Sequence, residues 1–299
     1  MSFPFFAAAS PIPAEPVPLT ETEIYARAQT VIDLTHEELL LAYADELRDL
    51  EFSESQQELD SLLQKVGENV ERFFRDLPNT ISKEQVRREW ISLDGRVDAS
   101  ITQNYNYTSR LDKLGGWIEG RTDNKGNDIL PEPMPGTASF LTLGFAAASL
   151  PFHPKHQFGC RFRYLGRLRS EPYLQVIAFA QKPGTADIVG NFTSHLQPAP
   201  VRLLYQGFVW VDPSSFQIVR LRQGLLAPRY DAHLAAVNSD IWYSAVRFQS
   251  VAIPFWLPSE VVVTLQFTGQ WFRNRHRYSD YQVFTVAVEE KIIPPVVKK

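Results

Sequence analysis

Two histidines lie close together in the segment His153-Pro-Lys-His156 and could in principle hold a metal. A zinc site needs at least a third protein ligand and outer partners that orient the imidazoles. Pro154 also prevents a helical turn that would present both rings on one face. We therefore expect a solvated loop and no metal, and a metal-dependent hydrolase stays only as an alternative function.

The densest polar cluster is Arg273-Asn-Arg-His-Arg-Tyr-Ser-Asp280. In an extended strand, Arg273, Arg275 and Arg277 lie on one face, about 6.6 Å apart in succession. One interpretation is an exposed face that protects a sheet edge, because edge charges block strand addition. The other is a stripe that contacts an anion or an acidic partner.

Other signatures of chemistry are missing from the sequence. It contains no G-x-S-x-G, no H-E-x-x-H and no glycine-rich phosphate loop. The single cysteine, Cys160, excludes an internal disulfide. Its alternation with Phe158, Phe162 and Tyr164 predicts a buried, structural thiol. We accordingly predict a protein that is not an enzyme and that needs no cofactor.

Charge is divided unevenly along the 299 residues. The first hundred hold 20 acidic and 9 basic residues, although the net charge of the whole chain is only −4. No basic run is dense enough to indicate nucleic-acid binding, and no stretch approaches the ~18 apolar residues of a transmembrane segment. The apolar stretch Phe3-Pro-Phe-Phe-Ala-Ala-Ala-Ser10 resembles the end of a signal peptide, which predicts an exported or periplasmic protein.

Helical periodicity runs through residues 20–78. Thr35-His-Glu-Glu38 has the form of a capping box, in which the threonine hydroxyl and the glutamate carboxylate each accept a backbone N–H at the start of a helix. A second helix is expected from near Ser53 to Leu77, where Pro78 ends it. Its apolar residues recur three and four apart and form a stripe that another surface must cover.

Three hairpins are predicted where apolar, β-branched runs flank turn residues. The segment from Gly207 to Arg222 turns at Asp212-Pro-Ser-Ser215, and residues 260–267 and 271–288 turn at Thr268-Gly269. The third hairpin turns at Asp94-Gly95, a pair that favours a two-residue type I′ turn. The segment 139–150 is apolar all round and is either a short buried helix or a plug in a cavity.

Several of these motifs together resemble a group of exported acidobacterial proteins. They are Phe162-Arg-Tyr-Leu-Gly166, Val176-Ile-Ala-Phe-Ala-Gln181, Gly207-Phe-Val-Trp-Val-Asp212, Phe216-Gln-Ile-Val-Arg-Leu221, Leu226-Ala-Pro-Arg229 and residues 273–280. The G-x-x-W-x-D…I-x-R hairpin is also similar to that of the LolA-like outer-membrane lipoprotein-sorting superfamily. This resemblance implies a strongly curved, incompletely closed β-barrel whose concave side shelters acyl chains. The long acidic segment 20–78 departs from the pattern.

We expect one α+β domain, residues 20–289. It combines a helical layer at 20–78 with a curved antiparallel sheet of about eight to eleven strands, or half-open β-barrel, at 86–288. Residues 1–19 are expected to be a disordered tail or a signal-peptide remnant, and residues 290–299 a second tail.

The predicted function is binding or carriage of a hydrophobic ligand, such as a lipid or a lipoprotein acyl chain, in the bacterial cell envelope. The residues expected to line the ligand site are Phe140, Leu143, Phe145, Phe208 and Trp210. The alternative is an envelope protein that binds a protein partner and has a filled cavity. In that case Phe140, Leu143 and Phe145 are fully buried, and no pocket of roughly 300 Å³ remains between sheet and helices.

Overall fold

A computed structural model describes residues 20–111, 117–123, 125–127, 129, 140–194, 196–197, 199–249 and 251–284. The helices are α1 (Glu21–Ala26), α2 (His36–Ala42), α3 (Ala44–Leu47), α4 (Leu59–Asp76) and the 3₁₀ helices η1 (Ala147–Phe152), η2 (Gln157–Gly159) and η3 (Tyr230–Ala232). No helix in these ranges is both long and apolar enough to cross a membrane. The tails expected at 1–19 and 290–299 lie outside the described residues.

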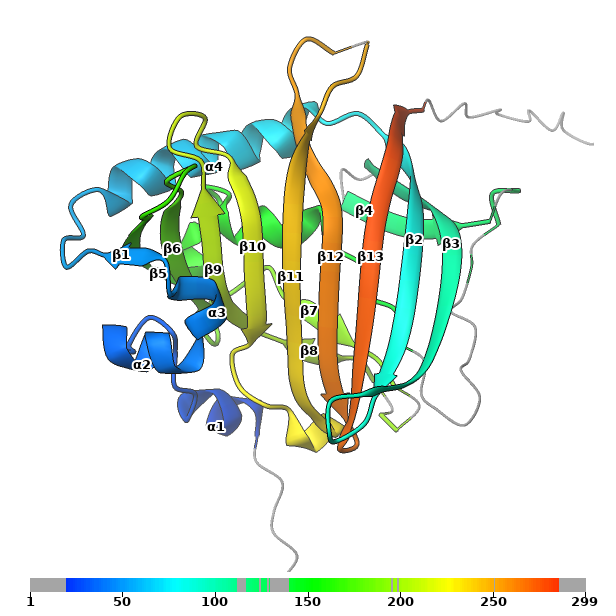
Figure 1. Cartoon of the computed structure of the whole chain (residues 1–299), viewed down its shortest axis with the longest axis horizontal. Coiled ribbons are helices and arrows are strands. Elements are labelled where there is room, and N and C mark those ends of the chain that lie inside the picture. The colour runs from blue at the N-terminus through cyan, green and yellow to red at the C-terminus, as the bar shows by residue number, and fades with distance from the viewer. Residues whose placement is uncertain are drawn as a thin grey trace, which may run out of the picture.

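One large antiparallel sheet dominates the structure (Figure 1). Its strands are β1 (Leu50–Phe52), β2 (Thr80–Ile91), β3 (Val97–Leu111), β4 (Trp117–Thr122), β5 (Cys160–Leu168), β6 (Gln175–Gln181), β9 (Tyr205–Val211), β10 (Ile218–Leu225), β11 (Leu234–Val246), β12 (Phe255–Phe267) and β13 (Gln270–Val283). These 11 strands follow the order β1-β5-β6-β9-β10-β11-β12-β13-β2-β3-β4, and a separate pair joins β7 (Gly190–Phe192) to β8 (Val201–Leu203). The two edge strands, β1 and β4, do not pair with each other, so the expected open, curved antiparallel sheet is confirmed.

The three predicted hairpins link neighbouring strands of the sheet. At β9–β10, the Asp212 carboxylate accepts the backbone N–H groups of Ser214 and Ser215, which closes the predicted turn. At β12–β13, Thr268 and Gly269 have φ values of 50° and 80°, as a type I′ turn requires. At β2–β3 the prediction of a two-residue turn was wrong. Ile91 is the last residue of β2 that pairs with β3, opposite Val97. The Ser92 amide donates to the Arg96 carbonyl, so three residues, and not two, lie within the turn.

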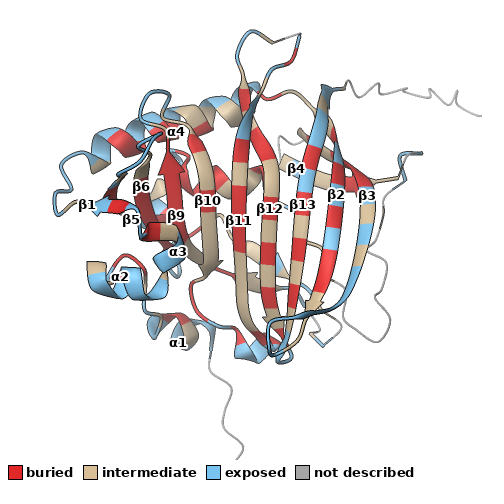
Figure 2. Ribbon diagram, viewed as in Figure 1, coloured by how far each residue is buried: buried red, intermediate tan, exposed pale blue. Residues whose placement is uncertain are grey.

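Helices cover both faces of one half of the sheet. Val209 and Val211 of β9 pack under α4 and η1, in a core that includes Leu62, Val66 and Phe152. Their neighbours Phe208 and Trp210 point to the opposite face, where they pack against Leu39 and Leu47 of α2 and α3. Figure 1 shows these two helical layers at one end of the sheet, and Figure 2 shows β6 and β9 buried along their length. The α4 side is the concave one, because the segment 140–152 on that side contacts strands near both edges.

Several expected boundaries differ from the structure. The first strand after α4 begins at Thr80 and not at residue 86, and β1, a strand of the same sheet, lies within the segment expected to be purely helical. The helix that starts after the Thr35 capping box breaks at Tyr43, whose φ and ψ of −134° and 40° are not helical. The capping box itself is present, and a second one, Thr20 with Glu23, begins α1.

The close approach of β9 and β10 gives a test of the register. A Cβ atom added to Gly207 would lie 1.9 Å from the Arg222 carbonyl oxygen, whereas one added to Gly120 of β4 meets nothing nearer than 3.5 Å. We expect Gly207→Ala to lower the free energy of unfolding by about 1–3 kcal/mol or more, the usual effect of overpacking. Gly120→Ala is the matched control and should change it by less than about 0.5 kcal/mol. Urea unfolding measures both, and equal stabilities would contradict the pairing register of β9 with β10.

Candidate functional site

An open cleft of about 610 Å³ lies on the concave face, lined by described residues. Its floor is formed by side chains of β9, β10 and β11, and its walls are the segments 142–151 and 187–191. The lining residues are Trp117, Glu119, Thr142, Leu143, Gly144, Phe145, Ala147, Ala148, Leu150, Pro151, Gln181, Asp187, Ile188, Val189, Gly190, Asn191, Tyr205, Gln223, Val237 and Ser239. The volume lies within the range of small-molecule sites.

The wall of the cleft is the apolar segment 140–152. Phe140 anchors its start, with its ring 5.0 Å from that of Phe267 and 5.1 Å from that of Phe272. Phe145 is buried beside His276, and its carbonyl accepts the Tyr243 hydroxyl at 3.0 Å. Residues 140–144 have no regular secondary structure and Ala147–Phe152 form the partly buried 3₁₀ helix η1, so the expected short helix is present in the second half of the segment only.

Glu119 fastens this wall to the edge strand β4. Its carboxylate accepts the backbone N–H groups of Gly144 and Ala147, each at 3.0 Å, and the indole N–H of Trp117 at 3.0 Å. The Tyr107 hydroxyl is a further donor. Burial disfavours the charged carboxylate and raises its pKa to about 7, against the lowering effect of these backbone donors.

A second buried polar group joins three strands beneath the wall. The guanidinium of Arg121 donates to Glu84 at 2.6 Å and to the Thr142 carbonyl at 2.9 Å. The Tyr278 hydroxyl also donates to Glu84, at 2.8 Å, and His276 Nδ1 lies 2.9 Å from the same carboxylate. Burial alone would raise the pKa of Glu84, but the His276 hydrogen bond and the charge of Arg121 hold it at about 2.

The buried residues Glu84, Arg121, His276 and Tyr278 hold the wall in place and are not arranged for catalysis. Burial lowers the pKa of His276 more than Glu84 raises it, so the imidazole is neutral near pH 7. Because Nδ1 then donates to Glu84, the other ring nitrogen, Nε2, is an acceptor, and no described atom donates to it. Neither His276 nor Glu84 lines the cleft, so a ligand there does not reach them.

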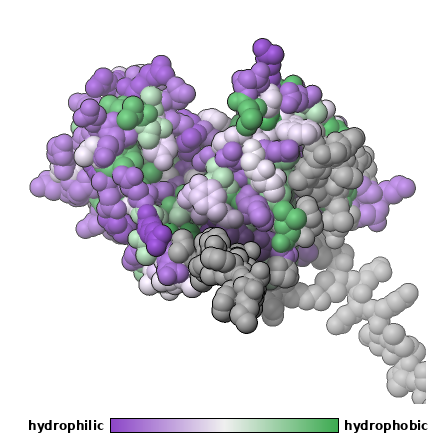
Figure 3. All heavy atoms as spheres, turned by 90° about the horizontal axis from the view of Figure 1, so that it is seen from below, coloured by the Kyte–Doolittle hydropathy of each residue, from purple (hydrophilic) through white to green (hydrophobic). Residues whose placement is uncertain are grey.

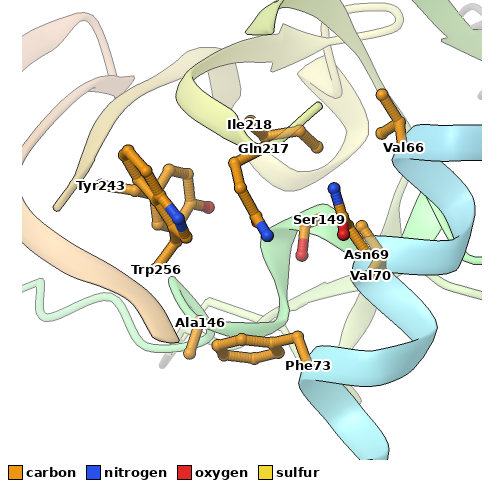
Figure 4. Close-up of a pocket in the computed structure, with 10 residues that line it drawn as sticks. All are labelled: Val66, Asn69, Val70, Phe73, Ala146, Ser149, Gln217, Ile218, Tyr243 and Trp256. Atoms are coloured by element: carbon orange, nitrogen blue, oxygen red, sulfur yellow. The ribbon is translucent and has the colours of Figure 1, made fainter. Parts of the chain in front are cut away.

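The space between α4 and the sheet is nearly filled. A pocket of only about 30 Å³ remains there, lined by α4, η1 and the β10 region, with the side chains of Gln217 and Ser149 pointing into it (Figure 4). That volume holds about one water molecule. The space under α4 is therefore too small for a ligand, unlike the cleft of about 610 Å³ beside it.

The five residues expected to line a ligand site are divided among three places. Leu143 and Phe145 line the cleft; Phe145 is buried, but Leu143 is 44% exposed. Phe140 is half-buried in the aromatic cluster that holds the wall. Phe208 and Trp210 lie on the opposite face under α2 and α3, because successive residues of a strand point to opposite faces. The sequence pattern missed Glu119 and Asp187, which only the folded chain brings to the cleft.

The three arginines lie on the outer face of β13, but they are not equivalent. The Glu89 carboxylate, only 4% exposed, lies 2.5 Å from Arg273, 3.5 Å from Arg275 and 3.0 Å from Arg87. Arg277 is exposed and has no ion pair among the described residues. β13 is also a central strand, so these arginines do not protect an edge. Contact of these three arginines with an anion stays a prediction. Arg277 is the most exposed of the three and is the one that could bind an anion without losing an ion pair to a described residue.

The histidine loop and the cysteine have ordinary surroundings. His156 pairs with Asp187 at 2.7 Å, whereas His153 is buried and not solvated as expected. No cluster that could hold a metal is present in the described part of the chain. Cys160 is buried, and burial raises its pKa to about 12, so it is not a reactive thiolate. Phe158, expected on the same side, is exposed because the strand starts two residues later.

Glu119 should give the protein a measurable pH dependence. Its pKa is about 7 in the folded protein and near 4.5 without the fold, so its protonated form contributes stability below pH 4.5 that is lost as the pH rises to 7. Between pH 5 and 8 we expect the wild type to lose stability relative to Glu119→Gln. Denaturant midpoints at several pH values measure this difference in stability. Any contribution from the titration of His276 is the same in both proteins and does not affect the difference.

The matched control is Glu37→Gln, at an exposed position of α2. It should follow the wild-type pH profile. A Glu119→Gln profile parallel to that of the wild type would show that the carboxylate keeps an ordinary pKa.

The arginine stripe gives a second test. Arg273→Gln removes a partner of the buried Glu89 carboxylate and should lower the free energy of unfolding by about 1–3 kcal/mol. Arg277→Gln changes an exposed side chain and should stay within about 0.5 kcal/mol. Thermal and urea unfolding of both variants measure the difference. Two equally stable variants would mean that Glu89 does not depend on Arg273.

Comparison with known proteins gives structural likeness without sequence likeness. No family model matches the chain, and no curated protein matches it. The chain is similar to a putative outer membrane lipoprotein-sorting protein domain from Vibrio parahaemolyticus, with 12% identity, a TM-score of 0.44, and 77% of this chain and 95% of that one covered. A LolA superfamily protein from Nitrosomonas europaea shares 11% identity, with a TM-score of 0.37 and coverage of 75% and 94%. A DUF1329 family protein from Desulfovibrio piger shares 8% identity, with a TM-score of 0.41 and coverage of 77% and 95%.

Proposed function

We propose that the protein is a non-catalytic binding or carrier protein for a ligand with a hydrophobic part, such as a lipid. The observation that carries the proposal is the cleft of about 610 Å³ that stays open between the sheet and its apolar wall. A filled core would have buried Leu143, yet this residue presents an exposed apolar side chain at the cleft. Burial of an apolar chain against it and against Leu150 and Val237 would drive binding.

The outer surface supports the cleft as the binding place. Seen from below in Figure 3, hydrophilic residues cover much of the described surface, and hydrophobic residues form separate patches. A broad apolar face is the usual mark of a protein or membrane interface. On the face seen in Figure 3, the described residues offer no broad apolar area to support the alternative of an envelope interaction protein, although the filled space under α4 agrees with that alternative.

The proposal includes a place in the bacterial cell envelope. The apolar stretch at residues 3–10, with its small residues, supports export. Fractionation of cells that produce the full chain, followed by detection in the periplasmic fraction, tests this part. Retention in the cytoplasm would remove it without affecting ligand binding.

Binding is tested with an uncharged fluorescent probe, N-phenyl-1-naphthylamine, and by native mass spectrometry of the protein purified from cells. The wild type should bind the probe and carry lipid-sized adducts. Leu143→Gln should weaken probe binding about tenfold, since contact with one leucine side chain contributes about 1.5 kcal/mol. Its melting temperature should hardly change, because the side chain is already half exposed.

The control is Leu93→Gln in the β2–β3 turn, where the leucine is 90% exposed. This variant should bind like the wild type. Saturable binding that is equal in both variants would place the ligand outside the cleft, and a protein that binds neither probe nor lipid is not a carrier.

A further inference from the structure

The described acidic and basic groups that line the cleft are carboxylates, and because the pKa of Glu119 is about 7 its carboxylate is mainly charged at pH 8. Two carboxylates, Glu119 and Asp187, line the cleft, and no Lys or Arg is among the described residues that do so. Arg121 lies nearby but is buried and bound to Glu84 and the Thr142 carbonyl. An anionic group that enters the cleft would leave water and meet negative charge without a cationic partner, which is unfavourable on both counts.

Two neutral polar side chains lie side by side on the cleft floor. Gln223 of β10 and Ser239 of β11 are directly opposite in the strand register, and both line the cleft. Ser239 is 4% exposed and Gln223 is half-buried. Two residues away on the same face of the same strands, Leu221 and Ile241 do not line the cleft and are fully buried apolar residues of the core. The polar pair therefore begins where the apolar core of β10 and β11 ends and the cleft opens.

Some polar side chains of the cleft are held by the protein, whereas Gln223 and Ser239, like Thr142, Asn191 and Tyr205, make no side-chain hydrogen bond to a described residue. Gln181 is held by the Tyr205 amide, which donates to its oxygen at 2.7 Å, and by the Ile188 carbonyl. Asp187 is paired with His156, and Glu119 accepts the donors described above. No described group of the protein hydrogen-bonds to the side chains of Gln223 or Ser239. A ligand that displaces water from them must supply donors or acceptors of its own.

We infer that the cleft selects amphiphiles with an uncharged, hydrogen-bonding head group, which Gln223 and Ser239 contact, and that it discriminates against anionic head groups. A hydroxyl or an ester or amide carbonyl satisfies an amide and a hydroxyl. The apolar chain lies along Leu143, Leu150 and Val237. This inference rests on the proposed function and adds the chemical class of the ligand.

The experiment compares ligands of equal chain length by displacement of N-phenyl-1-naphthylamine at pH 8, below their critical micelle concentrations. The uncharged ligands are 1-lauroylglycerol and dodecanol, and the anionic ones are laurate and dodecyl phosphate. We expect the uncharged ligands to bind at least tenfold more tightly than the anionic ones. Anionic ligands that bind equally well or better would overturn the inference while leaving the carrier function intact. Failure of the probe itself to bind would contradict the proposed function instead.

A double variant, Gln223→Leu with Ser239→Ala, tests the two residues directly. It should weaken 1-lauroylglycerol binding about tenfold and leave dodecane binding unchanged or tighter, since dodecane has no head group. The matched control is Gln266→Leu in β12, a half-buried glutamine outside the cleft, which should preserve the wild-type ratio of the two affinities. An unchanged ratio in the double variant would overturn the assignment. Circular dichroism and the melting temperature establish that each variant is folded, and Gln223→Glu, which keeps the length of the side chain, should weaken laurate binding further.

Discussion

The structure depends on one constraint, which is that strands β6 and β9 are apolar on both faces. Successive residues of a strand point in opposite directions, so two separate covers are needed. On the concave side α4 and η1 bury Ile177, Val209 and Val211, and on the other side α2 and α3 bury Phe208 and Trp210. The acidic N-terminal segment is thus part of the fold's core on two faces, and the sheet cannot be a simple half-barrel with one lid.

The opposite half of the sheet solves a different problem, because its concave face contains charge. Glu84 and Arg121 are removed from water there, which is unfavourable unless each charge finds partners. The carboxylate of Glu84 has Arg121, His276 and Tyr278 around it, and Arg121 also holds the Thr142 carbonyl. Together with Glu119, these contacts tie the wall segment to β4 and β2. Buried electrostatics therefore positions a wall whose own side chains are mostly apolar.

The cleft exists because the helical cover of α4 and the wall segment 140–152 leave part of the concave face of the sheet uncovered. Beneath α4 the packing leaves room for about one water molecule, whereas beyond η1 the wall stands away from the floor of β10 and β11 and leaves about 610 Å³. The polar pair Gln223 and Ser239 lies in this gap, where the described residues of η1 that line the cleft have apolar side chains. In the function that we propose, the shape of the cleft, its carboxylates and the polar pair together select the ligand.

Local signals in the sequence determined the hairpins, the capping boxes and the strand alternation, because these depend on residues near one another in the chain. Asp212 in its turn, Thr35 with Glu38, and the opposed faces of Arg275 and His276 could all be predicted in this way. The sequence alone did not predict which part of the fold each of those faces would contact. Tertiary pairing put β13 in the interior of the sheet, so Arg273 and Arg275 contact Glu89 of β2, which lies 184 residues before Arg273 in the chain. Pairing also turned Phe208 and Trp210 away from the cleft and brought Glu119 to the wall. Alternation fixes which residues share a face, but only the packing of distant elements decides what covers that face and where space remains.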